Sequence, residues 1–191
     1  MRRMLFAVLL VGLFVPVASA QNHAELGVYG DYFRLSQTDT NMAGLGGRLS
    51  VTVDSPLSFE AEMNYDFEQA FTEGFMNSGT GTITTARSNV QLLYGLFGPK
   101  IESHGPVRIF LTVKGGFIHF NLGNVPGTFG SFTSDVENLR DNNVSGALYP
   151  GGGLETSIGP VGLRLDVGDD IYFNGGAHHN LRIAFGPVIR F

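Results

Sequence analysis

Hydrophobic and polar residues alternate along most of the chain. The last eleven residues show this pattern clearly, because every second position is apolar: Leu181, Ile183, Phe185, Pro187, Ile189 and Phe191. Successive side chains of a β-strand point to opposite faces, so the alternation predicts a strand with one apolar face. That face continues to Phe191, which therefore needs cover from a protein core or from lipid.

Eight segments carry the same pattern, and turn-forming residues separate them. The sequence predicts strands at about 23–33, 43–53, 58–71, 86–96, 107–117, 144–158, 161–170 and 181–191. The connections between them are predicted at 36–41, 54–57, 72–82, 102–106, 121–143, 159–160 and 174–180. Around Gly98-Pro99 the pattern is interrupted, which suggests a bulge or an edge position. No helix, linker or second domain is evident. Because short connections join neighbouring strands, we predict an all-β fold, a single eight-stranded antiparallel up-and-down barrel.

The first twenty residues differ from the rest of the chain. Arg2 and Arg3 precede an apolar run at 4–15, and Ala18-Ser19-Ala20 ends the segment, as in a secretory signal peptide cut after Ala20. The run is shorter than the ~20 residues that a membrane-spanning helix needs. We therefore expect a signal peptide at 1–20 and a single barrel domain at 21–191. No later apolar run reaches that length either, so the mature chain can cross a membrane only as a closed barrel.

Composition narrows the choice of function. Without Arg2 and Arg3 the chain has 12 − 2 = 10 basic residues against 17 acidic ones, a formal charge of 10 − 17 = −7. This balance argues against a nucleic-acid partner. The chain contains no cysteine, so disulfides and thiolate chemistry are excluded and stability must come from burial or from the membrane. No cofactor is expected.

Two kinds of barrel fit the alternation, and they differ in whether the polar face points outward to water or inward to the lumen. A soluble lipocalin-like barrel turns its apolar face inward, whereas a membrane barrel turns it toward lipid. Aromatic residues on the apolar parity favour the membrane, because they gather near the predicted strand ends, where interfacial girdles lie: Tyr32, Phe59, Tyr65, Phe67, Tyr94, Phe117 and Phe191. In strand four we assign the lipid face to Ala86, Val90, Leu92, Tyr94 and Leu96. Lipid would also cover Phe191.

The opposite parity mixes glycine with charges of both signs. An eight-stranded barrel is just wide enough for side chains to fill it, so these charges are expected to neutralise one another in a plugged lumen. The predicted lumen network consists of Arg48, Glu60, Glu62, Asp66, Arg87, Lys114, Glu155, Arg164, Asp166 and Arg182, and Arg108 shares their parity. We interpret it as structural charge compensation. The alternative is a gate around Arg48, Glu60 and Glu62 that opens a water path.

Several segments resemble the small outer-membrane β-barrel family typified by the OmpA membrane domain and OmpX. They are Gly44-Leu45-Gly46-Gly47-Arg48, Gly153-Leu154-Glu155, Gly162-Leu163-Arg164 and the ending from Gly186 to Phe191, together with the signal peptide and the strand spacing. The resemblance covers essentially all of 21–191. It implies a bacterial outer membrane, contact with its lipid, and both termini and the short turns in the periplasm. It also implies that Phe185, Ile189 and Phe191 form a signal for the barrel-assembly machinery. The peptidoglycan-binding domain of full-length OmpA is expected to be absent.

Other candidate chemistry is weaker. Lipid A deacylases and palmitoyl transferases also use small barrels, but no local motif of either joins the candidate residues His178, His179, Asp169, Asp170, Ser131 and Ser134. Adjacent histidines point apart on a strand, and Asp135, Glu137 and Asp141 lack the spacing of a calcium loop, so no metal site is predicted. We expect a non-enzymatic protein with a structural role, or one that binds an extracellular ligand through its loops. The alternatives are a small ion channel and a lipid A-modifying enzyme.

Overall fold

The computed structural model describes residues 24–76, 80–81, 83–123 and 144–191, without the side chains of 71, 73–76, 83–88 and 122–123. These residues form eight strands: β1 (Ala24–Leu35), β2 (Thr40–Asp54), β3 (Leu57–Met76), β4 (Ile83–Glu102), β5 (Val107–Gly123), β6 (Val144–Ile158), β7 (Val161–Phe173) and β8 (Ala177–Arg190). Among them, no helix is long and apolar enough to cross a membrane. The predicted signal peptide at 1–20 lies outside the described residues.

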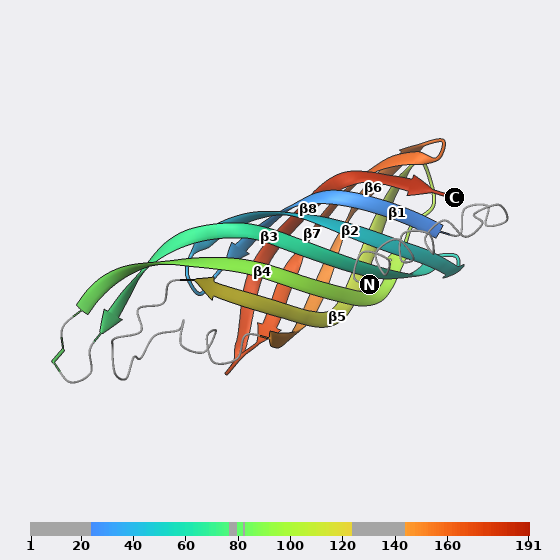
Figure 1. Cartoon of the computed structure of the whole chain (residues 1–191). Coiled ribbons are helices and arrows are strands. Elements are labelled where there is room, and N and C mark those ends of the chain that lie inside the picture. Colours follow the sequence, from blue (N-terminus) through green and yellow to red (C-terminus); the bar gives the residue numbers. More distant parts are fainter. Residues whose placement is uncertain (1–23, 77–79, 82, 124–143) are drawn as a thin grey trace, which may run out of the picture.

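The eight strands close into one antiparallel barrel, as predicted. Each strand pairs with its neighbours in sequence, and β8 returns to pair with β1. Leu26 of β1, for example, lies opposite Leu49 of β2 on one side and Ile189 of β8 on the other. The strands are tilted and twisted around the barrel (Figure 1). The fold class read from the alternation is therefore confirmed.

The two ends of the barrel differ. Short turns at 55–56, 103–106 and 159–160 lie at the end that holds both ends of the described chain, which we call the short-turn end. There the Ala24 and Phe191 backbones exchange two hydrogen bonds of 3.0 Å. Gly159 has φ of 63°, a left-handed conformation that glycine adopts without steric cost, in the two-residue turn between β6 and β7. We call the opposite end the long-loop end.

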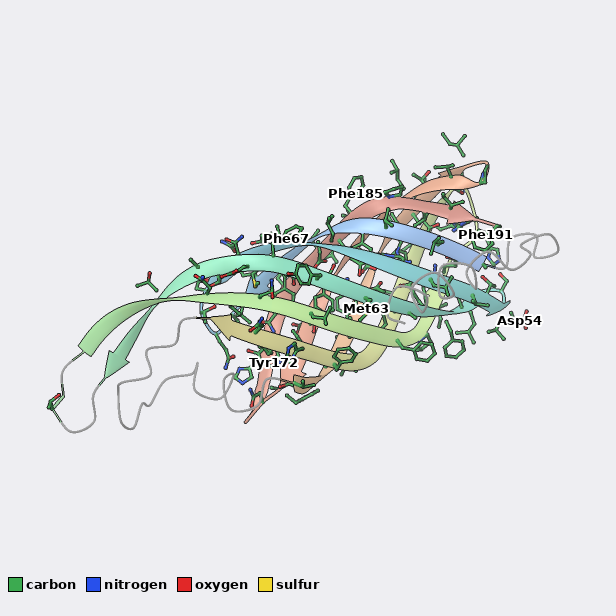
Figure 2. All side chains as sticks on the ribbon, viewed as in Figure 1. Asp54, Met63, Phe67, Tyr172, Phe185 and Phe191 are labelled. Atoms are coloured by element: carbon green, nitrogen blue, oxygen red, sulfur yellow. The ribbon has the colours of Figure 1, made fainter. Side chains whose placement is uncertain are left out.

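The outer wall of the barrel is apolar and the interior holds the charges. Outward positions alternate with buried ones on every strand, and their large apolar residues include Leu45, Leu49, Met63, Ile109, Leu111, Leu163 and Phe185. Figure 2 shows Met63, Phe67 and Phe185 along this wall, with Asp54 and Phe191 at the short-turn end. This inside-out distribution is that of a transmembrane barrel and not of a lipocalin. Five of the seven predicted girdle aromatics are exposed on this wall, and Phe191 is half-buried at its edge.

The predicted facing of β4 is wrong, and with it the place of Tyr94 in the girdle. Val90, Leu92 and Tyr94 are fully buried inside the barrel, as is nearly all of Leu96. Phe97, on the other parity, is 58% exposed. Both faces of β4 carry large apolar residues, so alternation did not decide between them. Pairing with β3 and β5 does, because a strand has one register in the closed sheet.

Several connections are shorter than predicted. The Gly-, Ser- and Thr-rich stretch 72–82 was expected to be a loop, yet β3 continues to Met76 and β4 starts at Ile83. Likewise β5 continues to Gly123. Once two strands are in register, backbone hydrogen bonds extend the ladder without an alternating pattern. No register shift occurs at Gly98-Pro99 in either pairing of β4; shifts occur between Thr52 and Asp54 and between Asp66 and Gln69.

Candidate functional site

A layer of paired charges fills the lower part of the lumen, nearer the short-turn end. We call it the charge network; its members are the acids Glu25, Asp31, Glu60, Glu62, Glu155 and Asp166 and the bases Arg48, Lys100, Arg108, Lys114, Arg164 and Arg182. All are buried, and each base has one of these acids within 4.0 Å. Six negative groups therefore face six positive ones. Such pairing offsets part of the cost of removing charges from water.

Glu60 lies at the centre of this network. Its Oε1 forms an ion pair with Lys114 Nζ at 2.6 Å and accepts a hydrogen bond from Arg164 Nη2 at 3.0 Å, and its Oε2 accepts one from Arg164 Nη1. Arg164 also reaches Asp166 at 2.8 Å, and Lys114 also contacts Glu62. Each cation thus bridges two carboxylates. The alternation predicts this in outline, because these residues occupy the inward parity of β3, β5 and β7.

Aromatic rings separate and support the cations. The Arg182 guanidinium lies 4.9 Å from the centroid of the Tyr149 ring and 5.0 Å from that of Tyr94. Arg48 lies 4.2 Å from the Tyr29 ring, and Arg164 lies 4.0 Å from the Phe110 ring. Cations over ring faces gain electrostatic attraction that strengthens where water is excluded. Rings and ion pairs together fill the lumen.

The network continues to the short-turn end. Lys100 approaches Glu102 at 3.2 Å, and Arg190 donates to Glu25 at 3.1 Å. Beside them lies a cavity of about 510 Å³ lined by residues of two turns, where the Ser55 hydroxyl and His104 Nε2 are 2.8 Å apart. That contact joins the 54–57 turn to the 102–106 turn.

The upper part of the lumen, toward the long-loop end, is filled mainly by apolar side chains, beside a few buried polar ones such as Asp170 and Asn180, which the sequence did not predict. We call it the upper cluster; it consists of Phe33, Leu35, Met42, Val90, Leu92, Tyr94, Leu96, Ile118, Phe120, Ala147, Tyr149 and Tyr172. Phe120 packs on Tyr172 with ring centroids 4.8 Å apart. The Tyr172 hydroxyl in turn donates to Gln37. The lumen is therefore plugged by charge below and by apolar packing above.

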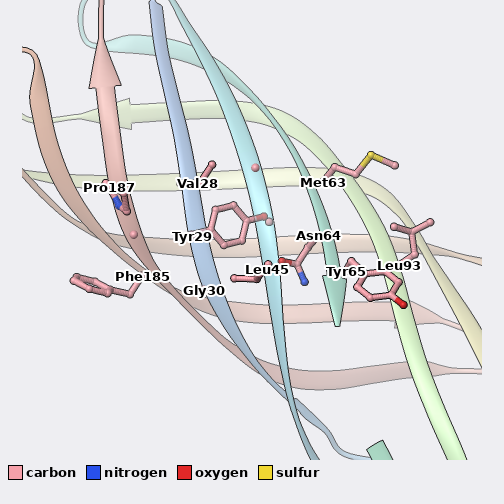
Figure 3. A pocket seen from close by; sticks show the side chains of 13 residues that line it. Val28, Tyr29, Gly30, Leu45, Met63, Asn64, Tyr65, Leu93, Phe185 and Pro187 are labelled. Carbon is pink, nitrogen blue, oxygen red and sulfur yellow. The ribbon is translucent and has the colours of Figure 1, made fainter. Parts of the chain in front are cut away.

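A shallow groove of about 650 Å³ crosses the outer wall over β8, β1, β2, β3 and β4 (Figure 3). Phe185, Leu45, Met63 and Tyr65 rise around it, and the outward Gly30 forms part of its floor. Its lining is almost wholly apolar. In a membrane barrel such a surface contacts hydrocarbon.

These features together decide the fold. The fold is that of the small outer-membrane β-barrels. No protein-family profile matches the chain, and no curated protein sequence is significantly similar to it. Solved structures are similar. Ail, the attachment invasion locus protein of Yersinia pestis in complex with the heparin analogue sucrose octasulfate, is 12% identical, with a TM-score of 0.56 over 90% of this chain and 100% of Ail. Neisserial surface protein A is 14% identical, with a TM-score of 0.54 over 88% of this chain and 97% of that protein.

Nine of the ten lumen residues named from the sequence are buried inside the barrel: Arg48, Glu60, Glu62, Asp66, Lys114, Glu155, Arg164, Asp166 and Arg182. Eight of them are ion-paired as described above; Asp66 has no basic partner among the described side chains. The tenth, Arg87, lies on β4 opposite Thr72, and its side chain is not among those described. Sequence reasoning missed Lys100, whose parity matches Leu96. Lys100 lies on the same face of β4 as Leu96, and a charged side chain on that face indicates that the face points into the lumen and not toward lipid.

Phe185 and Ile189, named as part of the assembly signal, point outward from β8 and are about half exposed. Phe191 follows the last residue of β8 and is half-buried. The geometry places all three on the outer side of the barrel or at its short-turn end. That the barrel-assembly machinery recognises these residues stays a prediction.

The residues considered for catalysis do not form a catalytic constellation among the described residues. His178 stacks on Tyr172 with ring centroids 4.9 Å apart, and His179 instead contacts Asp169 at 2.5 Å. The two histidines thus point apart, as expected on a strand. Ser131, Ser134, Asp135, Glu137 and Asp141 lie outside the described residues.

Proposed function

We propose that this protein is a non-enzymatic bacterial outer-membrane protein that presents a binding surface to an extracellular partner from a plugged barrel. The apolar wall and the filled lumen support insertion as a rigid anchor, and the similar fold of Ail and Neisserial surface protein A supports the outer membrane as the location. Residues 1–20 would direct export and be cleaved after Ala20. The short turns and both termini would then lie in the periplasm, and Phe185, Ile189 and Phe191 would engage the barrel-assembly machinery.

One observation carries the binding role: the β3–β4 hairpin extends well past its neighbours (Figure 1). β3 last pairs with β2 at Asp66, opposite Gly44, and β4 first pairs with β5 at Asn89, opposite Gly123. Beyond these points β3 and β4 pair only with each other, as far as Met76 opposite Ile83. This ribbon therefore has two edges whose backbone N–H and C=O groups face no strand of the described chain.

Open strand edges are templates for another strand. An extended segment of a partner can add to such an edge, with main-chain hydrogen bonds supplying affinity and side chains supplying specificity. We therefore infer that the partner is a protein that contributes an extended strand. The rest of the barrel is closed by pairing and offers no comparable edge among the described residues.

The test shortens the ribbon and leaves the barrel intact. Replacing residues 71–88 by Asn-Gly would join the paired residues Ala70 and Asn89 through a two-residue hairpin turn. We expect the variant to fold, as shown by the altered electrophoretic mobility of unheated folded barrels. We also expect bacteria that display it to lose binding to an array of extracellular-matrix and serum proteins, relative to bacteria with the full chain. Equal binding by both would contradict the proposal.

The two alternative functions make different predictions. A channel needs a continuous water path, but the charge network and the upper cluster leave the Glu60, Lys114 and Tyr94 side chains with no solvent exposure. We therefore expect no steady ion conductance from the purified protein in a planar bilayer. A lipid A-modifying enzyme would change the mass profile of lipid A when its gene is deleted, and we expect that profile to stay unchanged.

A further inference from the structure

The outer wall of the barrel lacks side chains at two neighbouring positions. Gly30 on β1 and Gly47 on β2 both lie on the outward parity. Gly30 is paired with Leu45, and Gly47 is paired with Val28, which is two residues from Gly30, so the two glycines are diagonal neighbours. Both line the apolar groove of about 650 Å³ described above, which we call the wall groove (Figure 3).

The backbone does not require glycine at either position. Neither residue has a positive φ, and a Cβ on either would stay 3.9 Å from the nearest atom beyond its chain neighbours, an ordinary van der Waals distance. The inward Gly46 is different, because a Cβ there would lie 2.3 Å from the Tyr29 ring. Glycine also weakens a strand interior. What the missing side chains at Gly30 and Gly47 do is to keep the wall groove open.

The wall groove offers contact with hydrocarbon and carries no charge. Its outward side chains are apolar apart from one hydroxyl: Val28, Leu45, Met63, Tyr65, Leu93, Phe185 and Pro187. The Tyr65 hydroxyl already accepts a hydrogen bond from Gln91. Arginine and lysine bind the phosphate of a lipid head group, and neither lines the groove. A ligand in the groove is therefore held by its apolar part.

The shape of the wall groove fits a single chain. It reaches along β1, β2 and β3 from 28 to 30, from 45 to 47 and from 63 to 65, and it crosses five adjacent strands from β8 to β4. With a rise of about 3.3 Å per residue and strands about 4.8 Å apart, it covers roughly 7 Å by roughly 19 Å. This strip of roughly 130 Å² is far smaller than the ~800 Å² that each partner buries in a stable protein interface. One extended hydrocarbon chain fills such a strip, whereas a second copy of the barrel needs a much larger matching surface.

The wall groove also lies where lipid reaches it. Gly30 is near the middle of β1, and the exposed wall continues past it on both sides, with Leu26 toward the short-turn end and Tyr32 toward the long-loop end. The hydrocarbon core of the bilayer meets this band of a transmembrane barrel. Acyl chains are therefore the partner that surrounds the groove.

We propose that the wall groove binds one acyl chain of a bilayer lipid and retains that lipid more firmly than the rest of the wall does. The site recognises the hydrocarbon chain and not the head group. It is independent of the binding role proposed for the β3–β4 ribbon, which lies beyond the closed part of the barrel.

The test counts the lipids that stay on the refolded chain in native mass spectrometry, after release from non-ionic detergent micelles. The micelles contain either dipalmitoyl phosphatidylethanolamine or dipalmitoyl phosphatidylglycerol. We expect one retained lipid per chain, to the same extent for both head groups. Gly47→Leu fills the groove without adding charge, and we expect it to lower retention at least five-fold. Gly47→Ala adds only one methyl group and should retain more lipid than Gly47→Leu.

Gly146→Leu is the matched control. Gly146 also lies on the outward parity, on β6 and away from the groove, and a Cβ there meets nothing within 4 Å. We expect this variant to retain lipid as the unchanged chain does, and we expect all three variants to show the altered electrophoretic mobility of unheated folded barrels. The proposal would be overturned by no retained lipid on the unchanged chain, by equal retention in Gly47→Leu and Gly146→Leu, or by retention of only one of the two lipids. A dimer of the unchanged chain that Gly47→Leu abolishes would instead identify a second copy as the occupant.

Discussion

Changing Glu60 to glutamine tests whether the lumen is held by charge balance. The substitution keeps the shape of the side chain and removes its negative charge, which leaves the network with one surplus cation. Removing one partner of a buried ion pair typically costs about 3–5 kcal/mol. In this variant Lys114 would keep its ion pair with Glu62, and Arg164 would keep its ion pair with Asp166. We therefore expect the lower end of that range, a loss of about 3 kcal/mol in the free energy of unfolding.

Urea-induced unfolding in lipid vesicles measures this loss. Tyrosine fluorescence and electrophoretic mobility without heating report the folded fraction, since the chain has no tryptophan. Glu68→Gln is the control on the same strand, because Glu68 is exposed and accepts one hydrogen bond from Asn89. We expect the control to change stability by no more than about 0.5 kcal/mol. Equal effects of the two substitutions would refute the view that Glu60 is a buried, charge-compensating group.

The double variant Glu60→Met with Lys114→Met separates charge balance from lost contacts. It removes one negative and one positive charge, so the network stays balanced. Replacing a buried ion pair by apolar side chains of similar volume is often close to neutral. We expect the double variant to be more stable than either single methionine variant. A double variant that loses the sum of the two single effects would show that Glu60 and Lys114 act independently.

Three further predictions concern the wall of the barrel. Leu49→Arg should destabilise the protein by about 2–4 kcal/mol if Leu49 lies near the bilayer midplane, whereas Ser50→Thr inside the barrel should be much milder in the same unfolding assay. Gly186→Ala should cost about 1–3 kcal/mol, because a Cβ there would lie 2.0 Å from a backbone carbonyl oxygen of β1. Because the chain has no cysteine, Phe97→Cys should react with a lipid-soluble maleimide and Leu96→Cys should be protected, which tests the corrected facing of β4.

Most of the fold follows from the sequence because strand alternation is a local pattern, and because short connections make neighbouring strands pair until an even number of them can close the sheet. Where one face of a strand is charged and the other apolar, as in β3 with Glu60 and Glu62 opposite Ala61 and Met63, the facing is unambiguous. Where both faces are apolar, as in β4, the register with the neighbouring strands decides which face points inward. That register cannot be deduced from the sequence of one strand alone. Lys100 was the residue that could have settled β4, since a charge at that parity has no place in hydrocarbon.

The sequence indicated much of the membership of the charge network, but it missed Glu25, Asp31 and Lys100 and did not specify the pairing. Inward parity identifies Arg48, Glu62 and Asp166 as lumen residues, yet which cation meets which carboxylate depends on the tilt and shear of the barrel. The upper cluster was missed for a related reason. Phe33, Met42 and Phe120 lie on inward parities near the strand ends, where the prediction assumed a polar lumen throughout.

The pairing pattern also bears on whether the barrel can act as a gate. A gate that works by exchanging one salt bridge needs a cation that can leave one carboxylate for another at little cost. Here Lys114 already contacts Glu60 and Glu62, and Arg164 already contacts Glu60 and Asp166. Moving either cation leaves two buried carboxylates short of charge at once, and the apolar upper cluster would still block the path above them. Opening this lumen would therefore require concerted rearrangement of both layers, which favours a fixed plug that supports the protruding ribbon over a switchable pore.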